Sequence, residues 1–143
     1  MEPIIFESPL WKVILLENQY YLGRNIVVYK GDAVHLSQLS LEAFVELKRI
    51  IDVLESSISK VFGATHFNWT CLMNDYYKPK NRDKKKELHL HCWPRYEKEV
   101  IFEGESFIDE VFGHHYDKTK EKIVTVELLN KIKTKIKIKS NIK

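Results

Sequence analysis

Residues 87–96 read Glu-Leu-His-Leu-His-Cys-Trp-Pro-Arg-Tyr, with polar and apolar side chains alternating over the first half. Alternation with a period of two is typical of a half-buried strand, so His89 and His91 are expected on one face and the apolar residues between them on the other. An imidazole that is buried away from solvent needs a hydrogen-bond partner. Two imidazoles on one strand face therefore indicate the floor of a functional site; the alternatives are a surface pair or a buried hydrogen-bond network.

Other segments carry clear secondary-structure signals. Strands are predicted within residues 11–17, 25–29, 66–73 and 87–93, which are rich in β-branched and aromatic residues. A helix is predicted from Ser40, a suitable N-cap, to Gly63, a suitable C′ residue. Its apolar residues recur at helical spacing: Leu41, Phe44, Val45, Ile51, Leu54, Ile58, Val61 and Phe62. A second helix is predicted over residues 120–133, whereas residues 96–117 show no clean period.

The C-terminal end is open to two interpretations. Residues 131–139 alternate lysine with isoleucine or threonine, which favours a strand paired to a sheet edge. The other interpretation is a frayed basic tail, because chain ends are often poorly ordered. We therefore assign residues 1–130 to a single domain and residues 131–143 to a basic tail.

The segment around the two histidines resembles the signature His-φ-His-φ-His-φ-φ of the histidine triad (HIT) superfamily, where φ is apolar, with Glu87 in place of the first histidine. Residues 21–28, 35–40 and 68–74 are similar to the family's second strand, the run into its long helix and the strand before the triad. The likeness spans roughly residues 10–116 and is greatest to the branch in which Pro-Arg-Tyr follows the triad. It implies an α+β fold, with the long helix packed on an antiparallel sheet that continues across a homodimer.

The resemblance also implies a reaction. His89 matches the nucleophile that attacks the α-phosphate of a nucleotide, with Nδ1 held by a hydrogen bond so that Nε2 faces phosphorus, and water then opens the nucleotidyl-histidine. His91 matches the residue expected to donate to a non-bridging phosphate oxygen. Asn74 matches an amide that closes on the phosphate and the leaving group. The implied activity is a nucleotide phosphohydrolase or nucleotidyl transferase acting on dinucleoside polyphosphates or nucleoside phosphoramidates.

A nucleoside would lie in an apolar slot between the first two strands. The candidate walls are Ile14, Leu16 and Ile26, and either Glu17 or Asn18 is expected to bind the ribose hydroxyls.

Glu87 is the main departure from the family pattern. An ionised carboxylate accepts hydrogen bonds but repels phosphate, so it needs a neutralising partner. Arg24 stands where several relatives carry another histidine, and we expect an Arg24–Glu87 pair in that contact. The alternative is that both side chains are solvated. An unpaired Glu87 would weaken turnover and leave a nucleotide-binding or sensor protein.

Residues 75–86 form a predicted polar connection, here called the basic loop. Its cations would attract a polyphosphate, or nucleic acid non-specifically; the alternative is that they only make the loop soluble. They are Lys78, Lys80, Arg82, Lys84, Lys85 and Lys86. Together with the basic tail, the loop admits a further function, the removal of adenylate from nucleic-acid ends, although the aromatic residues that single-strand binders interleave are sparse here.

Composition limits the classes of protein to which the chain can belong. The chain has 143 residues, 44% apolar content and a formal net charge of +3, which fit one domain and do not by themselves favour nucleic acid. Cys71 and Cys92 are expected to be reduced core thiols, and the lack of a Cys-x-x-Cys motif disfavours structural zinc. We expect no cofactor. Without a signal peptide or a membrane-length apolar run, a soluble cytoplasmic protein is expected. His114 and His115 receive no role.

Overall fold

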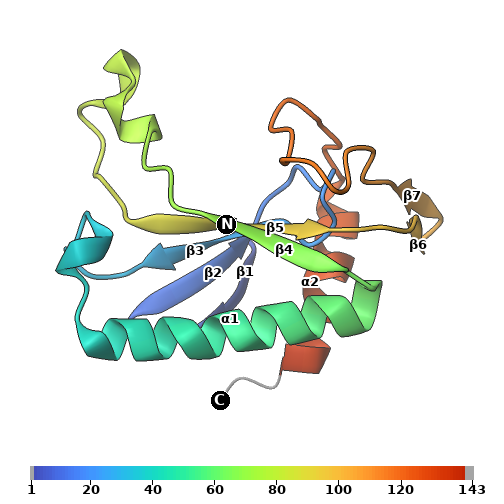
Figure 1. Ribbon diagram of the computed structural model, residues 1–143, viewed down its shortest axis with the longest axis horizontal. Coiled ribbons are helices and arrows are strands. Elements are labelled where there is room, and N and C mark those ends of the chain that lie inside the picture. Colours follow the sequence, from blue (N-terminus) through green and yellow to red (C-terminus); the bar gives the residue numbers. More distant parts are fainter. Residues whose placement is uncertain (1, 141–143) are drawn as a thin grey trace.

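The computed structural model describes residues 2–140, and one antiparallel sheet organises them (Figure 1). The strands follow the spatial order β1-β2-β3-β5-β4, which places β5 between β3 and β4. Their bounds are β1 (Ile4–Glu7), β2 (Trp11–Leu15), β3 (Asn25–Tyr29), β4 (His66–Thr70) and β5 (His89–Arg95). The predicted α+β class is confirmed. Each predicted strand overlaps an observed one, and β1, which pairs with β2, is an additional strand.

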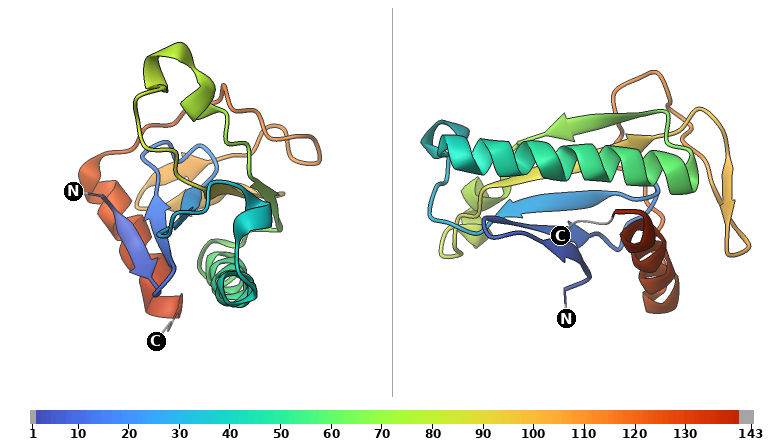
Figure 2. Two further views of the ribbon diagram at one scale, coloured as in Figure 1. Left: turned by 90° about the vertical axis from the view of Figure 1, so that its left-hand side faces the viewer. Right: turned by 90° about the horizontal axis from the view of Figure 1, so that it is seen from below.

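The long helix α1 (Leu41–Phe62) begins and ends where its caps predict. The hydroxyl of Ser40 accepts a hydrogen bond from the backbone N–H of Ala43 at 3.1 Å. Gly63 has a left-handed backbone with φ of 82°, a conformation that glycine adopts without steric strain. Both terminal predictions are confirmed, and α1 covers one face of the sheet (Figure 2).

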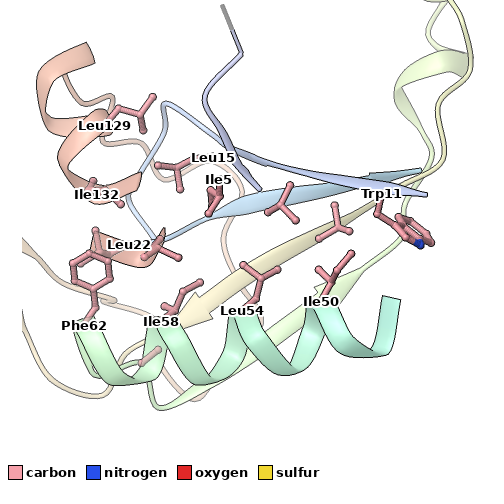
Figure 3. Packing of buried hydrophobic residues seen from close by; sticks show 14 of the residues in the cluster. Ile5, Trp11, Leu15, Leu22, Ile50, Leu54, Ile58, Phe62, Leu129 and Ile132 are labelled. Carbon is pink, nitrogen blue, oxygen red and sulfur yellow. The ribbon is translucent and has the colours of Figure 1, made fainter. Parts of the chain in front are cut away.

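The buried stripe of α1 differs from the predicted one. Ala43, Leu47 and Ile50 are buried together with Leu54, Ile58 and Phe62, at spacings of three and four residues. Three residues predicted for this stripe are exposed instead: Leu41, Phe44 and Val45. Figure 3 shows the inward side chains of α1 meeting those of the sheet. The first two turns of α1 therefore present apolar side chains to the outside.

The second helix, α2 (Val126–Ser140), starts later and ends later than predicted. It packs against α1 and β1, and its Ile132 and Ile136 are fully buried. Residues 131–140 are therefore neither an edge strand nor a frayed tail, because two isoleucines four residues apart lie on the same side of a helix and reach the core. The last three residues of the predicted tail, 141–143, lie outside the described residues.

A small hairpin extends from the end of the main sheet, formed by β6 (Val100–Phe102) and β7 (Glu105–Phe107). Three short 3-10 turns complete the described structure: η1 (Leu36–Gln38), η2 (Asp75–Tyr77) and η3 (Pro79–Asn81). The basic loop thus contains two of these turns. Within residues 2–140, none of the helices has the length and apolar character required to cross a membrane.

Candidate active site

The two histidines of β5 lie on the sheet face opposite α1. In the strand register, His89 pairs with Val28, which pairs with Lys12. His91 pairs with Ile26 in the same way. Register partners point to the same face, so these residues form one surface, while Leu88 and Cys92 point toward the core, as predicted. In Figure 1, the basic loop rises from this surface at one end and the orange segment before α2 rises at the other.

A backbone contact orients the imidazole of His89. Its Nδ1 lies 2.9 Å from the carbonyl oxygen of Glu87. A carbonyl oxygen only accepts, so Nδ1 carries the proton and donates it. The neutral ring then has its lone pair on Nε2, the form that a nucleophilic imidazole requires. This contact uses the backbone of Glu87, and therefore does not depend on which side chain occupies that position.

His91 is held as a neutral imidazole. Burial, the neighbouring His89 and the charge of Arg24 lower its pKa from 6.5 to about 4. Its ring centroid is 5.1 Å from that of His89 and 5.7 Å from that of Trp93. Its Nδ1 is buried and has no hydrogen-bond partner among residues 2–140. A neutral imidazole carries one N–H, which can donate one hydrogen bond to a ligand oxygen.

Arg24 stacks on Trp93 and does not pair with Glu87. The guanidinium carbon of Arg24 is 3.7 Å from the centroid of the Trp93 ring, a close cation–π contact. No ion pair joins Arg24 and Glu87 in the described structure, where Glu87 is exposed. The predicted Arg24–Glu87 pair is therefore wrong, because the aromatic face takes the guanidinium. The pKa of Lys12 is raised chiefly by its hydrogen bond to Glu2, and Glu87 adds to this effect.

A buried amide fixes the turn that carries Arg24. Gln19 is fully buried, and its Nε2 donates to the carbonyl oxygens of Leu16 and Arg24. Its Oε1 accepts from the N–H of Gly23, whose φ is 91°. A Cβ at Gly23 would also come within 3.2 Å of Ile58 on α1. The Gly-Arg turn is therefore held from inside, which directs Arg24 toward Trp93.

Arg95, in the Pro-Arg-Tyr segment, ties the far end of β5 to the chain before α2. Both Arg95 and Asp109 are buried, and their charged groups meet at 2.7 Å. The same guanidinium donates to the side-chain oxygen of Asn68 and to the carbonyl oxygens of Val111 and His114. These bonds satisfy the buried charges, as their removal from water requires.

The segment that Arg95 holds covers Trp93. Tyr116 stacks on the Trp93 ring at a centroid separation of 3.9 Å and an angle of 12°. Tyr21 packs edge-on against the Trp93 ring, and its hydroxyl accepts from the N–H of Asp117. Trp93 is consequently buried, and the surface beyond His91 is closed by aromatic rings.

A cleft of about 310 Å³ opens over His89. Its floor is formed by strand residues and its wall by the basic loop, and the lining comprises Ile26, Val28, Met73, Asp75, Tyr76, Asn81, Lys84, Lys85, Lys86, Glu87 and His89. The structure thus brings three predicted site residues together in one cleft: His89, Glu87 and Ile26.

Other predicted residues lie elsewhere. Ile14 shares the face through its register with Ile26 but is itself buried, and Leu16 lies beyond the end of β2. Asn18 is occupied: its amide donates to the carbonyl of Lys120 and accepts from the N–H of Lys122. Asn18 thus anchors the segment before α2, and its predicted ribose contact stays a prediction.

Glu17 and Asn74 lie outside the cleft lining. Glu17 is exposed, and its backbone carbonyl accepts from the N–H of Val124. Asn74 is exposed between Met73 and Asp75, both of which line the cleft. Neither side chain is therefore placed to contact a ligand at His89 in this conformation.

Some residues of the site were not predicted. Val28 lines the cleft, and its position two residues after Ile26 in a predicted strand was a usable signal. Tyr116 carried no such signal, because it reaches Trp93 only through the fold of residues 109–117. Among the described side chains, no group of three or more His, Cys, Asp or Glu could hold a metal ion.

No protein-family model matches the chain, and no curated protein matches it. Solved structures do match it in fold. A hypothetical histidine triad nucleotide-binding protein from Sulfolobus tokodaii is 15% identical, with a TM-score of 0.65 over 97% of this chain and 83% of that one. A histidine triad protein from Sinorhizobium meliloti is 17% identical, with a TM-score of 0.66 over 96% and 89%.

A diadenosine triphosphate hydrolase from Plasmodium falciparum, solved in complex with cyclomarin A, is 12% identical to the chain. Its TM-score is 0.62, covering 95% of this chain and 74% of the hydrolase. These likenesses establish that the chain has the fold of histidine triad proteins.

Proposed function

We propose that the chain is a nucleotide phosphohydrolase or nucleotidyl transferase that acts at the α-phosphate through a nucleotidyl-histidine intermediate on His89. The observation that carries the proposal is the hydrogen bond from His89 Nδ1 to the Glu87 carbonyl, which leaves Nε2 unprotonated beside a cleft. The fold of histidine triad proteins, one of them a diadenosine triphosphate hydrolase, supports the same reaction class.

The reaction has two displacements. Nε2 of His89 attacks the α-phosphorus, an N–P bond forms, and the bond to the leaving group breaks with its electron pair. The leaving group takes a proton from solvent. Water then attacks phosphorus, the N–P bond breaks, its electron pair returns to Nε2, and the proton lost by water goes to solvent. The products are a nucleoside monophosphate and the free leaving group, with His89 regenerated.

His91 is proposed to donate its single N–H to a non-bridging oxygen of the α-phosphate. Its neutral state follows from its lowered pKa of about 4. Because a neutral donor adds no positive charge, any charge compensation for the phosphate must come from other groups near the cleft.

The test is incubation of the purified protein with diadenosine tetraphosphate and, separately, with adenosine 5′-phosphoramidate, followed by chromatography. We expect adenosine monophosphate from both. Samples denatured in alkali and kept alkaline for mass spectrometry should carry an adenylate on His89, because an N–P bond survives alkali and breaks in acid. A protein that forms neither adenosine monophosphate nor the adduct would refute the proposed reaction.

The second candidate function is a nucleotide-binding or sensor protein. Glu87 favours it, because an exposed carboxylate lines the cleft and has no ion pair within the described chain. A negative charge at this place weakens the binding of phosphate and of a more highly charged transition state. Binding of adenosine nucleotides without turnover would identify this function.

We also propose a homodimer whose sheet continues across the two-fold axis. β1 and β4 are the outer strands of the sheet, and within residues 2–140 each has an edge that pairs with no other strand. The exposed Leu41, Phe44 and Val45 give α1 the apolar surface that a homodimer interface buries.

A further inference from the structure

Hydrogen bonds inside the basic loop hold its backbone, and so place the Cα atoms of its lysines beside the cleft. Asn81 is buried although the loop is otherwise largely exposed. Its side-chain nitrogen donates to the Asp75 carbonyl at 3.0 Å, and its own carbonyl accepts from the N–H of Lys84 at 3.1 Å. Asn81 thus links the start of the loop to the residue at which the lysine run begins.

Four of the six cations of the loop fall into two groups. Arg82 and Lys86 lie over the rings of Tyr76 and Tyr77, and the ammonium of Lys86 donates to the Tyr77 hydroxyl. These two cations support the loop itself. Lys84 and Lys85 line the cleft, are exposed, and form no ion pair with any residue from 2 to 140. Their ammonium groups remain available to a ligand.

The carboxylates of the cleft do not neutralise the charges of Lys84 and Lys85. Asp75 is paired with Lys78 at 2.9 Å, which lowers the pKa of its carboxyl and offsets its charge. Glu87 is the other carboxylate in the lining, next to His89 on the floor. The wall of the cleft is therefore cationic, whereas its floor combines an imidazole with the apolar Ile26 and Val28.

We propose that Lys84 and Lys85 bind the phosphate chain of the leaving group, so that the site prefers dinucleoside polyphosphates to nucleoside phosphoramidates. This inference rests on the proposed function for the position of the α-phosphate at His89. A cleft of about 310 Å³ is at the lower end of small-molecule sites, which suits a phosphate chain better than a whole dinucleotide. A polyphosphate carries several negative charges to this wall, whereas a phosphoramidate carries its charge on one phosphate alone.

The decisive comparison uses two variants with the same change in charge. Lys84→Ser/Lys85→Ser removes the two cleft cations that have no partner in the loop and leaves Lys86, which is held by Tyr77. Lys98→Ser/Lys118→Ser removes two exposed lysines that do not line the cleft. We expect the first variant to raise KM for diadenosine tetraphosphate roughly tenfold, with less than a twofold change for adenosine 5′-phosphoramidate. The second variant should match the parent for both substrates. Equal changes for both substrates, or equal changes in both variants, would overturn the inference.

A binding measurement separates this inference from the proposed reaction. Inorganic tripolyphosphate, titrated calorimetrically, should bind the parent and the Lys98→Ser/Lys118→Ser protein, with affinity that falls as salt rises. Lys84→Ser/Lys85→Ser should lose most of this binding. If the parent turns over no nucleotide yet shows this pattern, the polyphosphate site stands and the proposed reaction fails. If the lysine pair changes the binding of a single-stranded oligonucleotide but not that of tripolyphosphate, the loop serves nucleic acid and the inference fails.

Discussion

The imidazole of His89 is the residue on which the proposed chemistry depends. His89→Ala removes the nucleophile, so kcat should fall by roughly 10³-fold or more, as when a covalent catalyst is deleted. The fold should persist, because the side chain is half-exposed and its only described hydrogen bond is to the neighbouring Glu87 backbone. His66→Ala is the matched control, since His66 lies at the far end of β4 and outside the cleft. Steady-state kinetics and circular dichroism check both variants, and parental activity in His89→Ala would contradict the mechanism.

The lowered pKa of His91 predicts a pH dependence of stability. The folded pKa of about 4 is below the ordinary 6.5, so the unfolded chain binds more protons between these values. The free energy of unfolding should therefore rise as pH increases from 4 to 6.5 and gain nothing more from His91 above that. Urea denaturation at pH 5 and pH 7 should show a smaller rise for His91→Asn than for the parent. Equal rises would show that His91 titrates normally.

Arg24 and Glu87 should act independently. Because Arg24 lies on Trp93 and not beside Glu87, the effects of Arg24→Ala and Glu87→Gln on the free energy of unfolding should add to within about 0.5 kcal/mol. Arg24→Ala combined with Trp93→Leu is the positive control and should deviate from additivity, because these residues are in contact. Chemical denaturation of the single and double variants measures both couplings. A larger coupling energy between Arg24 and Glu87 than between Arg24 and Trp93 would support the Arg24–Glu87 ion pair instead.

At the level of single residues, alternation in sequence was enough to place His89 and His91 on one face, since a strand leaves little freedom of direction. The same alternation could not reveal what each side chain meets across the sheet. The sequence suggested a carboxylate partner or solvent for Arg24, and only the register of β3 with β5 brings it next to the indole of Trp93. The hydrogen bonds of Asn18 to residues 120 and 122 likewise depend on a segment distant in sequence.

At the level of elements, α2 should be required for stability. Ile136→Ala removes a fully buried side chain from the core, so the free energy of unfolding should fall by roughly 2–5 kcal/mol. Lys135→Ala changes the exposed neighbour on the same helix and should have little effect. Thermal or urea denaturation compares the two. Equal stabilities would support the basic-tail interpretation of this region.

Elements with local signals were predicted well, and the others were not. Ser40 and Gly63 bound α1 because caps are chosen by local hydrogen bonding and backbone conformation. The Lys-Ile alternation of residues 131–139 fits a strand, yet Ile132 and Ile136 also suit one face of a helix, and burial against α1 and β1 decided the outcome. The β6–β7 hairpin has a two-residue turn at Glu103 and Gly104, both with positive φ. Its strands have only three residues each, too few for a clear alternating pattern in the sequence.

For the whole molecule, the exposed apolar side of α1 predicts a change of assembly on mutation. Phe44→Glu should place a charge in the proposed dimer interface and yield a monomer. Lys60→Glu, at an exposed site near the other end of the same helix and on another side of it, is the control and should retain the dimer. Light scattering after size exclusion distinguishes the 17.0 kDa chain from a species of twice that mass. A monomeric parent protein would contradict the proposed homodimer.

The ring stack on Trp93 has an optical consequence. A protonated imidazole quenches the fluorescence of a nearby indole. The ring centroids of His91 and Trp93 are 5.7 Å apart. In the ligand-free protein His91 is neutral at physiological pH, so Trp93 should emit with little quenching from this neighbour. A phosphate bound beside His91 raises the pKa of its imidazole, so the small protonated fraction would grow and dim that emission, although most rings stay neutral. With Trp11 and Trp69 replaced by phenylalanine, the natural fluorescence of a single indole would report site occupancy in real time.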